Sequence, residues 1–346
     1  MSGTARHDSL ATEGLLAKHD AVLLDLDGTV YRGGELIESA GAAIGRMRRE
    51  SVALRYVTNN ASSPADAVAR RLAGMGLPTE PFEVSTSAQA AAAVLAEKVP
   101  ADSRVLVVGT AALASEVRTR GLVPVSSRED EPAAVVQGHS PDTGWQLLAE
   151  ACLAIRDGAL WIACNGDVTL PSERGELPGN GAMVEALRAA TGVAPQFAGK
   201  PLRPLLDRAV SSAGSSAPLL VGDRLDTDIA GAVNAGIPAV MVFTGVDGPA
   251  GALFADPGMR PDHLAEDLGA LHRAPEVSAV AEQPGWKVRV EGSALELAAA
   301  SERADEDRLS ALRALCAAWW PVGSGPVRVR ADDPLAASAL RRLGWD

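Results

Sequence analysis

Two kinds of residue are scarce in this chain of 346 residues. Aromatic side chains make up only 3% of it, so a hydrophobic core must be built mainly from Ala, Val and Leu. There are three cysteines, Cys152, Cys164 and Cys316, which have neither the spacing of a metal site nor that of a CxxC pair. This usage predicts free thiols in a reducing compartment and argues against a disulfide framework.

Long apolar runs are also lacking, and basic residues are outnumbered by acidic ones, 32 to 44. No stretch reaches the length that a transmembrane helix needs, and the polar first twenty residues contain no signal-peptide core. We therefore expect a cytoplasmic protein without a membrane partner. The net charge of −12 argues against nucleic-acid binding, because that binding depends on basic surfaces. An anionic substrate would need a local positive charge, most simply a metal ion.

An apolar run followed by two acids forms the first motif. Residues 21–24 are typical of a buried parallel strand, and Asp25, Asp27 and Gly28 follow it. In an extended segment, residues two apart point to the same side, so both carboxylates would share one site and need a divalent cation. Gly28 would let a main-chain N–H approach an anion. The alternative is an ordinary Asp-Gly turn at a strand end.

Polar residues end two further predicted strands. The strand over 52–57 leads into Thr58, Asn59 and Asn60, whose hydroxyl and amide groups could hold phosphate oxygens, because ligands of open α/β sheets gather at the carboxyl ends of strands. A polar turn before a helix cap explains these residues equally well. Lys200 follows a short predicted strand and could pair with a carboxylate and a phosphate oxygen, although a lone lysine is usually solvated.

A second pair of acids follows another apolar strand, over 217–221. Asp223 could simply end that strand and Asp228 could cap the next helix, and both roles are compatible with a functional one. A parallel sheet could bring the two acids beside Asp25 and Asp27. Three or four carboxylate oxygens together with water match the preference of Mg²⁺ for hard ligands in octahedral geometry.

Strand and helix patterns restart at about residue 85, which predicts an inserted domain. We expect an α/β protein with a Rossmann-like parallel-sheet core over 1–84 and 195–273, an α/β cap domain over 85–194 and a small α+β domain over 274–346. The end of the cap, residues 165–182, is rich in Gly and Pro and predicts a long loop. That loop either selects the substrate or is a surface turn.

Four motifs occur in order, each at the end of a predicted strand. They are DLDGTVY at 25–31, TNN at 58–60, GKP at 199–201 and GDRLDTD at 222–228. Together they resemble the haloacid dehalogenase-like hydrolase superfamily over about residues 20–272. The insertion is similar to the cap of the subclass that contains NagD-like and 4-nitrophenylphosphatase-like enzymes. The resemblance implies a phosphatase that works through an aspartyl-phosphate intermediate.

The resemblance also implies roles for the four acids. Asp25 would be the nucleophile that attacks phosphorus, and Asp27 would protonate the leaving alkoxide and then take a proton from the attacking water. Asp223 would complete the magnesium shell, with Asp228 as an auxiliary ligand. A carboxylate nucleophile would repel a phosphate monoester unless a metal and a lysine screened its charge.

For the remaining residues, the resemblance implies contacts with the substrate. Thr58 and the Asn59 region would hold phosphoryl oxygens and Lys200 would neutralise charge. In the cap, relatives often carry an acid where this chain has His139, so His139 is either a substrate contact or a hydrogen-bonded structural residue. Asn165, at the start of the Gly- and Pro-rich segment, is a further candidate for substrate binding.

Residues 275–346 are not explained by the hydrolase motifs. The pattern predicts two strands, a helix over 304–320, a strand and a final helix, which resembles the closing part of GCN5-related acetyltransferases. The Gly-rich pyrophosphate loop of those enzymes is lacking, and the segment is about half as long as their domain. We therefore expect a packing or dimer-forming module, and hence a homo-oligomer, with an acyl-CoA-binding or partner-binding regulator as the alternative.

The expected activity is magnesium-dependent hydrolysis of a small phosphorylated metabolite. A capped core of this kind joined to an acetyltransferase-like tail resembles bacterial glycerol 3-phosphate phosphatases, which makes glycerol 3-phosphate the expected substrate. Phosphoglycolate, a nucleotide monophosphate, pyridoxal phosphate and a sugar phosphate are the alternatives.

Overall fold

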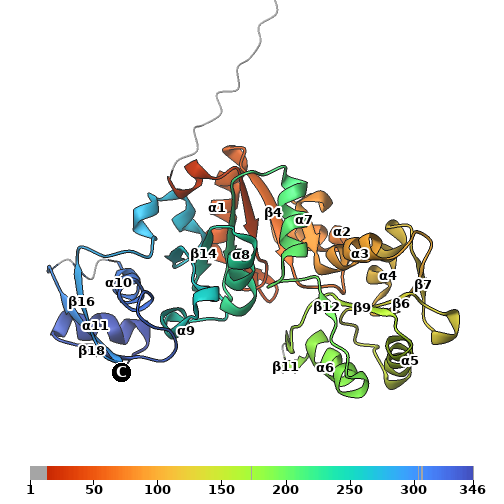
Figure 1. Cartoon of the computed structure of the whole chain (residues 1–346). Helices are drawn as coiled ribbons and strands as arrows, with labels where there is room; N and C mark the ends of the chain where they lie inside the picture. Colours follow the sequence, from red (N-terminus) through yellow and green to blue (C-terminus); the bar gives the residue numbers. More distant parts are fainter. Residues whose placement is uncertain (1–13, 173, 303, 305–306, 346) are drawn as a thin grey trace, which may run out of the picture. The chain divides into compact units, whose positions relative to one another are not determined.

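The computed structural model describes residues 14–172, 174–302, 304 and 307–345 (Figure 1). The chain forms two compact units. The first combines residues 1–54 with 213–346, and the second comprises residues 55–212. The predicted domain boundaries at 84/85, 194/195 and 273/274 stay predictions. No helix in the described ranges is long and apolar enough to cross a membrane.

A parallel sheet forms the centre of the first unit. Its strands are β1 (Ala21–Leu24), β13 (Pro218–Gly222), β14 (Ala239–Val242) and β15 (His263–Ala265), in the order β15-β14-β13-β1. All residues of β1 and β14 are buried, which explains their continuous apolar runs. Leu24 pairs with Val221, so β1 and β13 end side by side. The residues that follow the two strands are thereby brought together.

Helices and turns surround this sheet in the first unit. Helix α1 (Glu38–Arg49) places Ala40, Ala43, Ile44 and Met47 on one buried face, which is the spacing of an amphipathic helix. A π-helical turn, η4 (Leu225–Ile229), leads into α8 (Ala230–Ala235), and α9 (Pro249–Phe254) follows β14. A short hairpin that the sequence pattern did not predict joins β2 (Tyr31–Arg32) to β3 (Glu35–Leu36). The 3₁₀ turns are η1 (Gly14–Lys18), η5 (Pro257–Met259), η6 (Leu268–His272) and η7 (Pro275–Val277).

The C-terminal segment belongs to the first unit. Strands β16 (Trp286–Glu291) and β17 (Ala294–Ala299) are antiparallel, and β18 (Arg328–Ala331) runs parallel to β17. Helices α10 (Ser310–Trp319) and α11 (Pro334–Leu343) complete the predicted order of strands and helices. Helix α10 begins at Ser310, later than the predicted residue 304, because a turn at Asp307 precedes it. Residues 305 and 306 lie outside the described residues.

Two arginines hold this segment against the rest of the unit. Arg260 donates to the main-chain oxygens of Trp320 and Gly323 at 2.6 and 2.5 Å, and its guanidinium lies over the Trp320 ring. Arg313, which is only 2% exposed, donates to the main-chain oxygen of Leu264 in β15 at 3.0 Å. The C-terminal strands and helices are therefore hydrogen-bonded to the central sheet's last strand and its flanking loops.

The second unit contains a parallel pair and a five-stranded parallel sheet. Strand β4 (Ala53–Thr58), within which the division between the units falls, pairs with β5 (Val84–Thr86). The larger sheet has the order β12-β9-β8-β6-β7. Its strands are β6 (Arg104–Val108), β7 (Val123–Val125), β8 (Ala134–Gln137), β9 (Leu160–Ala163) and β12 (Gln196–Phe197). The short 3₁₀ turns are η2 (Pro81–Glu83) and η3 (Arg128–Asp130).

Helices alternate with these strands, as the sequence pattern predicts. They are α2 (Ala65–Gly74), α3 (Ser87–Lys98), α4 (Ala111–Thr119), α5 (Trp145–Arg156), α6 (Asn180–Thr191) and α7 (Arg203–Ala213). One core forms where α5 and α6 cover residues of β6, β8 and β9, and it includes the buried ring of Trp161. The fold is therefore the α/β architecture that was predicted, with parallel sheets covered by helices.

One expectation about the cap is wrong. The segment 165–182 was predicted as a long loop, but it contains an antiparallel hairpin of β10 (Thr169–Ser172) and β11 (Gly175–Pro178) and the start of α6. The Gly and Pro content of this segment obscures the hairpin because Pro and Gly are unfavourable in most strands. An exposed two-stranded hairpin tolerates them, since its outer edges need no partner.

Candidate active site

Three carboxylates meet at the carboxyl ends of β1 and β13. Asp25 directly follows β1, Asp223 directly follows β13, and Asp228 lies in the π-helical turn. One oxygen from each lies within 4.8 Å of the others, and Asp223 and Asp228 are buried while Asp25 is half-buried. The parallel register of β1 and β13 explains why acids almost two hundred residues apart in sequence are neighbours. We call Asp25, Asp223 and Asp228 the acidic cluster.

Main-chain and hydroxyl donors fix the carboxylate of Asp223. Thr29 Oγ1 donates to one of its oxygens at 3.3 Å, and the N–H of Val246 donates to the other at 2.8 Å. The chain passes so close that a Cβ built on Gly245 would lie 1.8 Å from the same carboxylate, and one on Gly28 would lie 2.3 Å from it. Gly28 also has a φ of +87°, a conformation that favours glycine.

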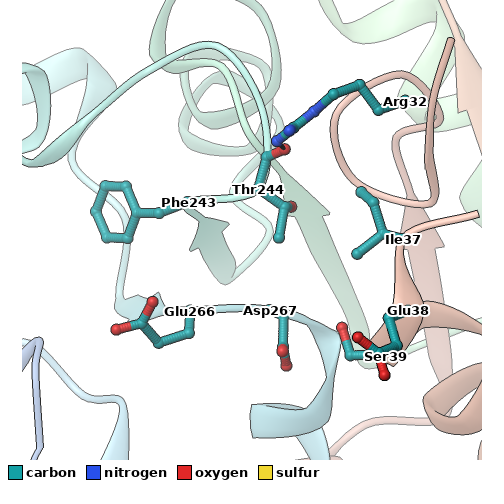
Figure 2. Close-up of a pocket in the computed structure, with 8 residues that line it drawn as sticks. All are labelled: Arg32, Ile37, Glu38, Ser39, Phe243, Thr244, Glu266 and Asp267. Atoms are coloured by element: carbon teal, nitrogen blue, oxygen red, sulfur yellow. Dashed lines mark hydrogen bonds between the residues drawn. The ribbon is translucent and has the colours of Figure 1, made fainter.

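The loop after β14 closes the other side of the cluster. Thr244 Oγ1 donates to the main-chain oxygen of Gly28 at 2.5 Å, and Arg32, from the β2–β3 hairpin, donates to the main-chain oxygen of Thr244. Figure 2 shows the Arg32 side chain reaching Thr244 at the edge of a pocket of about 560 Å³. This pocket also carries Glu266 and Asp267, so its charge is unsuited to a phosphate dianion.

Asp27 lies outside the acidic cluster. Its side chain is exposed and accepts a hydrogen bond from the hydroxyl of Tyr31 at 3.2 Å. The strand alternation used to place it beside Asp25 does not extend this far, because β1 ends at Leu24 and the main-chain oxygen of Leu26 accepts the N–H groups of Val30 and Tyr31 in a turn. Metal ligation by the Asp27 carboxylate therefore stays a prediction without support from this geometry.

The acidic cluster fits a divalent cation that prefers oxygen ligands. Three like charges within 4.8 Å repel one another unless a cation or a shared proton relieves them. Carboxylate oxygens are the hard ligands of Mg²⁺, which keeps several of its own water molecules. Asp25, Asp223 and Asp228 are the residues that would hold such an ion.

Gly28, which was predicted to offer its N–H to an anion, lies in the first unit, where that N–H donates to the main-chain oxygen of Tyr31 at 2.8 Å. The other predicted phosphate-binding residues of the core motifs lie together in the second unit. Thr58 ends β4, and its hydroxyl accepts the N–H of Asn60 at 3.1 Å. The Asn60 side chain in turn accepts the N–H of Ser62 at 2.7 Å, so it stabilises the turn that the alternative interpretation proposed. Lys200 is only 3% exposed, and its ammonium donates to the main-chain oxygen of Val57 at 3.1 Å. Thr58 is thus part of β4, and Lys200 is hydrogen-bonded to it through Val57.

The cap candidates differ in their contacts. Asn165, only 4% exposed, donates to the main-chain oxygen of Asn59 at 2.6 Å. His139 is half-buried, and among the described residues only its main-chain oxygen is hydrogen-bonded, to the hydroxyl of Ser62 at 2.8 Å. Burial raises the pKa of the neighbouring Cys164 thiol, which therefore stays protonated and is no nucleophile.

Several residues of these two groups were not predicted from the sequence. Asp167, whose carboxylate accepts from Asn59 at 3.3 Å, lies in the segment assigned to a loop, and its spacing from Asn165 was the available signal. The loop from Thr244 to Asp247 carries no recognisable motif. Its contribution is a main-chain N–H and a close approach, which depend on tertiary structure.

This chain belongs to the haloacid dehalogenase-like hydrolases. The family model of haloacid dehalogenase-like hydrolases matches residues 22–123, and a second, HAD-hydrolase-like model matches residues 197–271. The D-glycerol 3-phosphate phosphatase of Mycobacterium tuberculosis is 48% identical over 334 residues, which cover 94% of each chain. The family predicted from the four motifs is thereby confirmed, and with it an enzyme of the hydrolase class.

Solved structures show the same relationship. A crystal structure of the glycerol phosphate phosphatase of M. tuberculosis in complex with magnesium has a TM-score of 0.92 and 47% identity, covering 97% of this chain and all of that one. A 4-nitrophenylphosphatase from Thermotoga maritima has a TM-score of 0.70 and 30% identity, covering 76% of this chain. Residues 283–345 match a GCN5-related N-acetyltransferase-like domain, which confirms the resemblance of the C-terminal segment.

Proposed function

We propose that this hydrolase uses Mg²⁺ to convert glycerol 3-phosphate to glycerol and phosphate. The observation that carries the proposal is the acidic cluster, in which Asp25 stands beside two buried carboxylates at the ends of neighbouring strands. The similarity to the M. tuberculosis enzyme over 94% of both chains supports the choice of substrate. Held by the cluster, the metal would offset negative charge on the phosphoryl oxygens and on the nucleophile.

The reaction would proceed in two displacements at phosphorus. A carboxylate oxygen of Asp25 attacks phosphorus, the bond from phosphorus to the glycerol oxygen breaks, and Asp27 gives its proton to that oxygen. Asp27, now ionised, takes a proton from a water molecule, which attacks the aspartyl-phosphate and releases phosphate and free Asp25. Thr58 and Lys200 would stabilise charge on the transferred group. The exposure of Asp27 suits an acid that must exchange its proton with water.

Replacement of the nucleophile tests this mechanism. Asp25→Asn removes the attacking carboxylate while keeping the size of the side chain, so phosphate release from glycerol 3-phosphate and from 4-nitrophenyl phosphate should fall to background. Asp226→Asn is the matched control, because Asp226 is exposed and pairs with Arg224 at 2.8 Å instead of joining the cluster. Full activity of Asp25→Asn would refute the role of Asp25.

A substrate panel tests the choice of metabolite. The values of kcat/KM for glycerol 3-phosphate, phosphoglycolate, a nucleotide monophosphate, pyridoxal phosphate and a sugar phosphate should be compared at one Mg²⁺ concentration. We expect glycerol 3-phosphate to rank first. A tenfold higher value for one of the others would transfer the proposal to that compound and leave the phosphatase mechanism intact.

We further propose that the C-terminal segment is a packing module. The hydrogen bonds of Arg260 and Arg313 support this role, because they connect it to the unit that carries the acidic cluster. Calorimetry with acetyl-CoA tests the alternative, and clear binding would favour a regulator. Homo-oligomer formation remains a prediction, which a molar mass from light scattering would test. A cytoplasmic location is also proposed, and the three free cysteines agree with it.

A further inference from the structure

The side chain of Asn59 is hydrogen-bonded on both its oxygen and its nitrogen within the second unit's predicted phosphate site. Its side-chain oxygen accepts the main-chain N–H of Lys200 at 2.8 Å, and its side-chain nitrogen donates to the main-chain oxygen of Lys200 at 3.0 Å. One carboxamide therefore pairs with both main-chain groups of one residue. The second hydrogen of the same nitrogen points to the carboxylate of Asp167 at 3.3 Å.

These contacts use both N–H bonds of the Asn59 side chain. An asparagine carboxamide has two hydrogens to donate, and both are directed at protein acceptors. A phosphoryl oxygen needs a donor, so the side chain could bind one only by giving up a contact with Lys200 or Asp167. This disfavours a direct substrate contact by the Asn59 side chain, which was predicted from the position of its amide at the end of a strand.

The approach of the two segments requires a glycine before Lys200. A Cβ built on Gly199 would lie 2.6 Å from the side-chain oxygen of Asn59 and 2.5 Å from the main-chain oxygen of Cys164. No side chain fits at such distances without displacing main chain. Gly199 is therefore needed for the close packing of Lys200 against Asn59, and its role is not to provide a flexible linker.

The Asn59 contacts also reach into the cap segment. Asn165 donates from its side chain to the main-chain oxygen of Asn59 at 2.6 Å, and Asn180, at the start of α6, donates to the main-chain oxygen of Asn165 at 2.7 Å. Asn165 and Asn180 are 4% and 2% exposed, so these bonds are shielded from water. Buried amide contacts of this kind are costly to break.

We propose that Asn59 is a positioning residue that acts on the reaction through Lys200, and that Asn165 and Asn180 connect this pair to the cap. This inference rests on the proposed phosphatase function, in which Lys200 neutralises charge on the transferred group. Lys200 has its ammonium bonded to Val57 and its main chain bonded to Asn59, so the two ends of the residue are fixed separately.

A double-mutant cycle distinguishes positioning from substrate binding. With 4-nitrophenyl phosphate, Asn59→Ala should lower kcat/KM about 10²-fold and Lys200→Ala about 10²- to 10³-fold, the range for loss of an electrostatic contact to the transition state. If Asn59 acts through Lys200, the double variant should lie within about threefold of Lys200→Ala, because coupled residues are not additive. Additive losses in the double variant would overturn the inference.

Two further variants keep the test sharp. Asn59→Asp preserves the size of the side chain and its acceptor but loses both donors, so it should reproduce the loss even if Asn59→Ala folds poorly. Ser87→Ala removes a hydroxyl that donates to the main-chain oxygen of Asn59 at 2.5 Å and leaves the carboxamide pair intact, so its activity should stay within about threefold of wild type. Wild-type activity in Asn59→Asp would also overturn the inference.

The assay separates this inference from the substrate assignment. The double-mutant cycle is measured with an aryl phosphate and not with the natural metabolite. The test therefore stays valid even if glycerol 3-phosphate is not the natural substrate. Inhibition by inorganic phosphate adds a second readout in the Lys200→Ala background. There, Asn59→Ala should leave the inhibition constant unchanged within about threefold. A tenfold weaker inhibition would show that Asn59 contacts phosphate directly and would overturn the inference.

Discussion

Removing one acid from the cluster should abolish most of the increase in thermal stability that Mg²⁺ gives the wild-type protein. Asp228→Asn keeps the size of a buried side chain and leaves an oxygen that can still accept the N–H of Arg224, a bond of 3.1 Å in the wild type. It removes one of three negative charges within 4.8 Å of one another. The fold of the π-helical turn should therefore survive while the metal site loses a ligand.

The magnitude follows from binding linkage. A ligand that binds only the folded state at a hundred times its Kd adds about 2.7 kcal/mol to the free energy of unfolding. For folding units of 150–250 residues, 1 kcal/mol corresponds to about 2–4 °C in Tm, so saturating Mg²⁺ should raise the wild-type Tm by about 5–10 °C. At the same Mg²⁺ concentration, loss of a charged ligand should reduce this shift to about 2 °C or less.

Thermal unfolding in EDTA and in a Mg²⁺ series measures both quantities. Without metal, Asp228→Asn should not lower the Tm, because each pair of unit charges 4–5 Å apart costs about 3–4 kcal/mol at an effective dielectric constant of about 20. Asp226→Asn, two residues earlier in the same turn, should retain the full wild-type response to Mg²⁺. An Asp228→Asn protein with an undiminished Mg²⁺ shift would refute the assignment of Asp228 to the metal site.

Three further predictions concern other parts of the first unit. Gly28→Ala should lower activity by more than about 10²-fold in a phosphate-release assay, because its Cβ would lie 2.3 Å from a carboxylate oxygen of the cluster. Arg313→Met should lower the free energy of unfolding in urea by about 2–3 kcal/mol, since it leaves a buried main-chain oxygen of β15 without its donor. Asp20→Asn should cost about 1 kcal/mol at pH 7 and less at pH 3. Hydrogen bonds from Ser215, Ser216 and Ala217 hold the pKa of Asp20 below its usual range, so its contribution exists above about pH 4 and is lost as the pH falls further.

Two of these predictions have a matched control variant in the same chain. Gly33 also has a positive φ, +61°, but a Cβ there meets nothing within 4 Å, so Gly33→Ala should keep most of the activity. Arg308 is about half exposed and pairs with Glu266 at 2.8 Å, so Arg308→Met should cost at most about 1 kcal/mol. For Asp20, equal losses at pH 7 and pH 3 would contradict the electrostatic explanation.

Patterns of apolar residues predict much of the fold. The strands at 21–24 and 239–242 are continuous apolar runs because helices cover both faces of the sheet, so no partner-specific information is needed to recognise them. The helices of the second unit follow from their period and from breaks at Gly and Pro. The hairpin at 169–178 escaped prediction because an exposed pair of strands needs no apolar alternation.

The acidic cluster was only partly accessible to sequence reasoning. Asp25 and Asp223 are recognisable because each follows an apolar strand, and parallel strands present their carboxyl ends at one edge. The place of Asp27 was predicted from strand alternation, which stops where the main-chain oxygen of Leu26 organises a turn. Local turn geometry of this kind depends on contacts with the Thr244 loop, which no short motif reveals.

The order of the four motifs was sufficient to predict the enzyme family, because each carries a residue type that phosphoryl transfer requires at the end of a strand. Tertiary structure alone decided which of those residues serve one another. In the sequence, Asn59 is only a polar residue that follows a strand. In the folded chain, its carboxamide pairs with the main-chain N–H of Lys200 at 2.8 Å and with the main-chain oxygen of Lys200 at 3.0 Å. The physical reason is that hydrogen-bond partners distant in the chain are chosen by packing, whereas strand and helix periods are encoded by neighbouring residues.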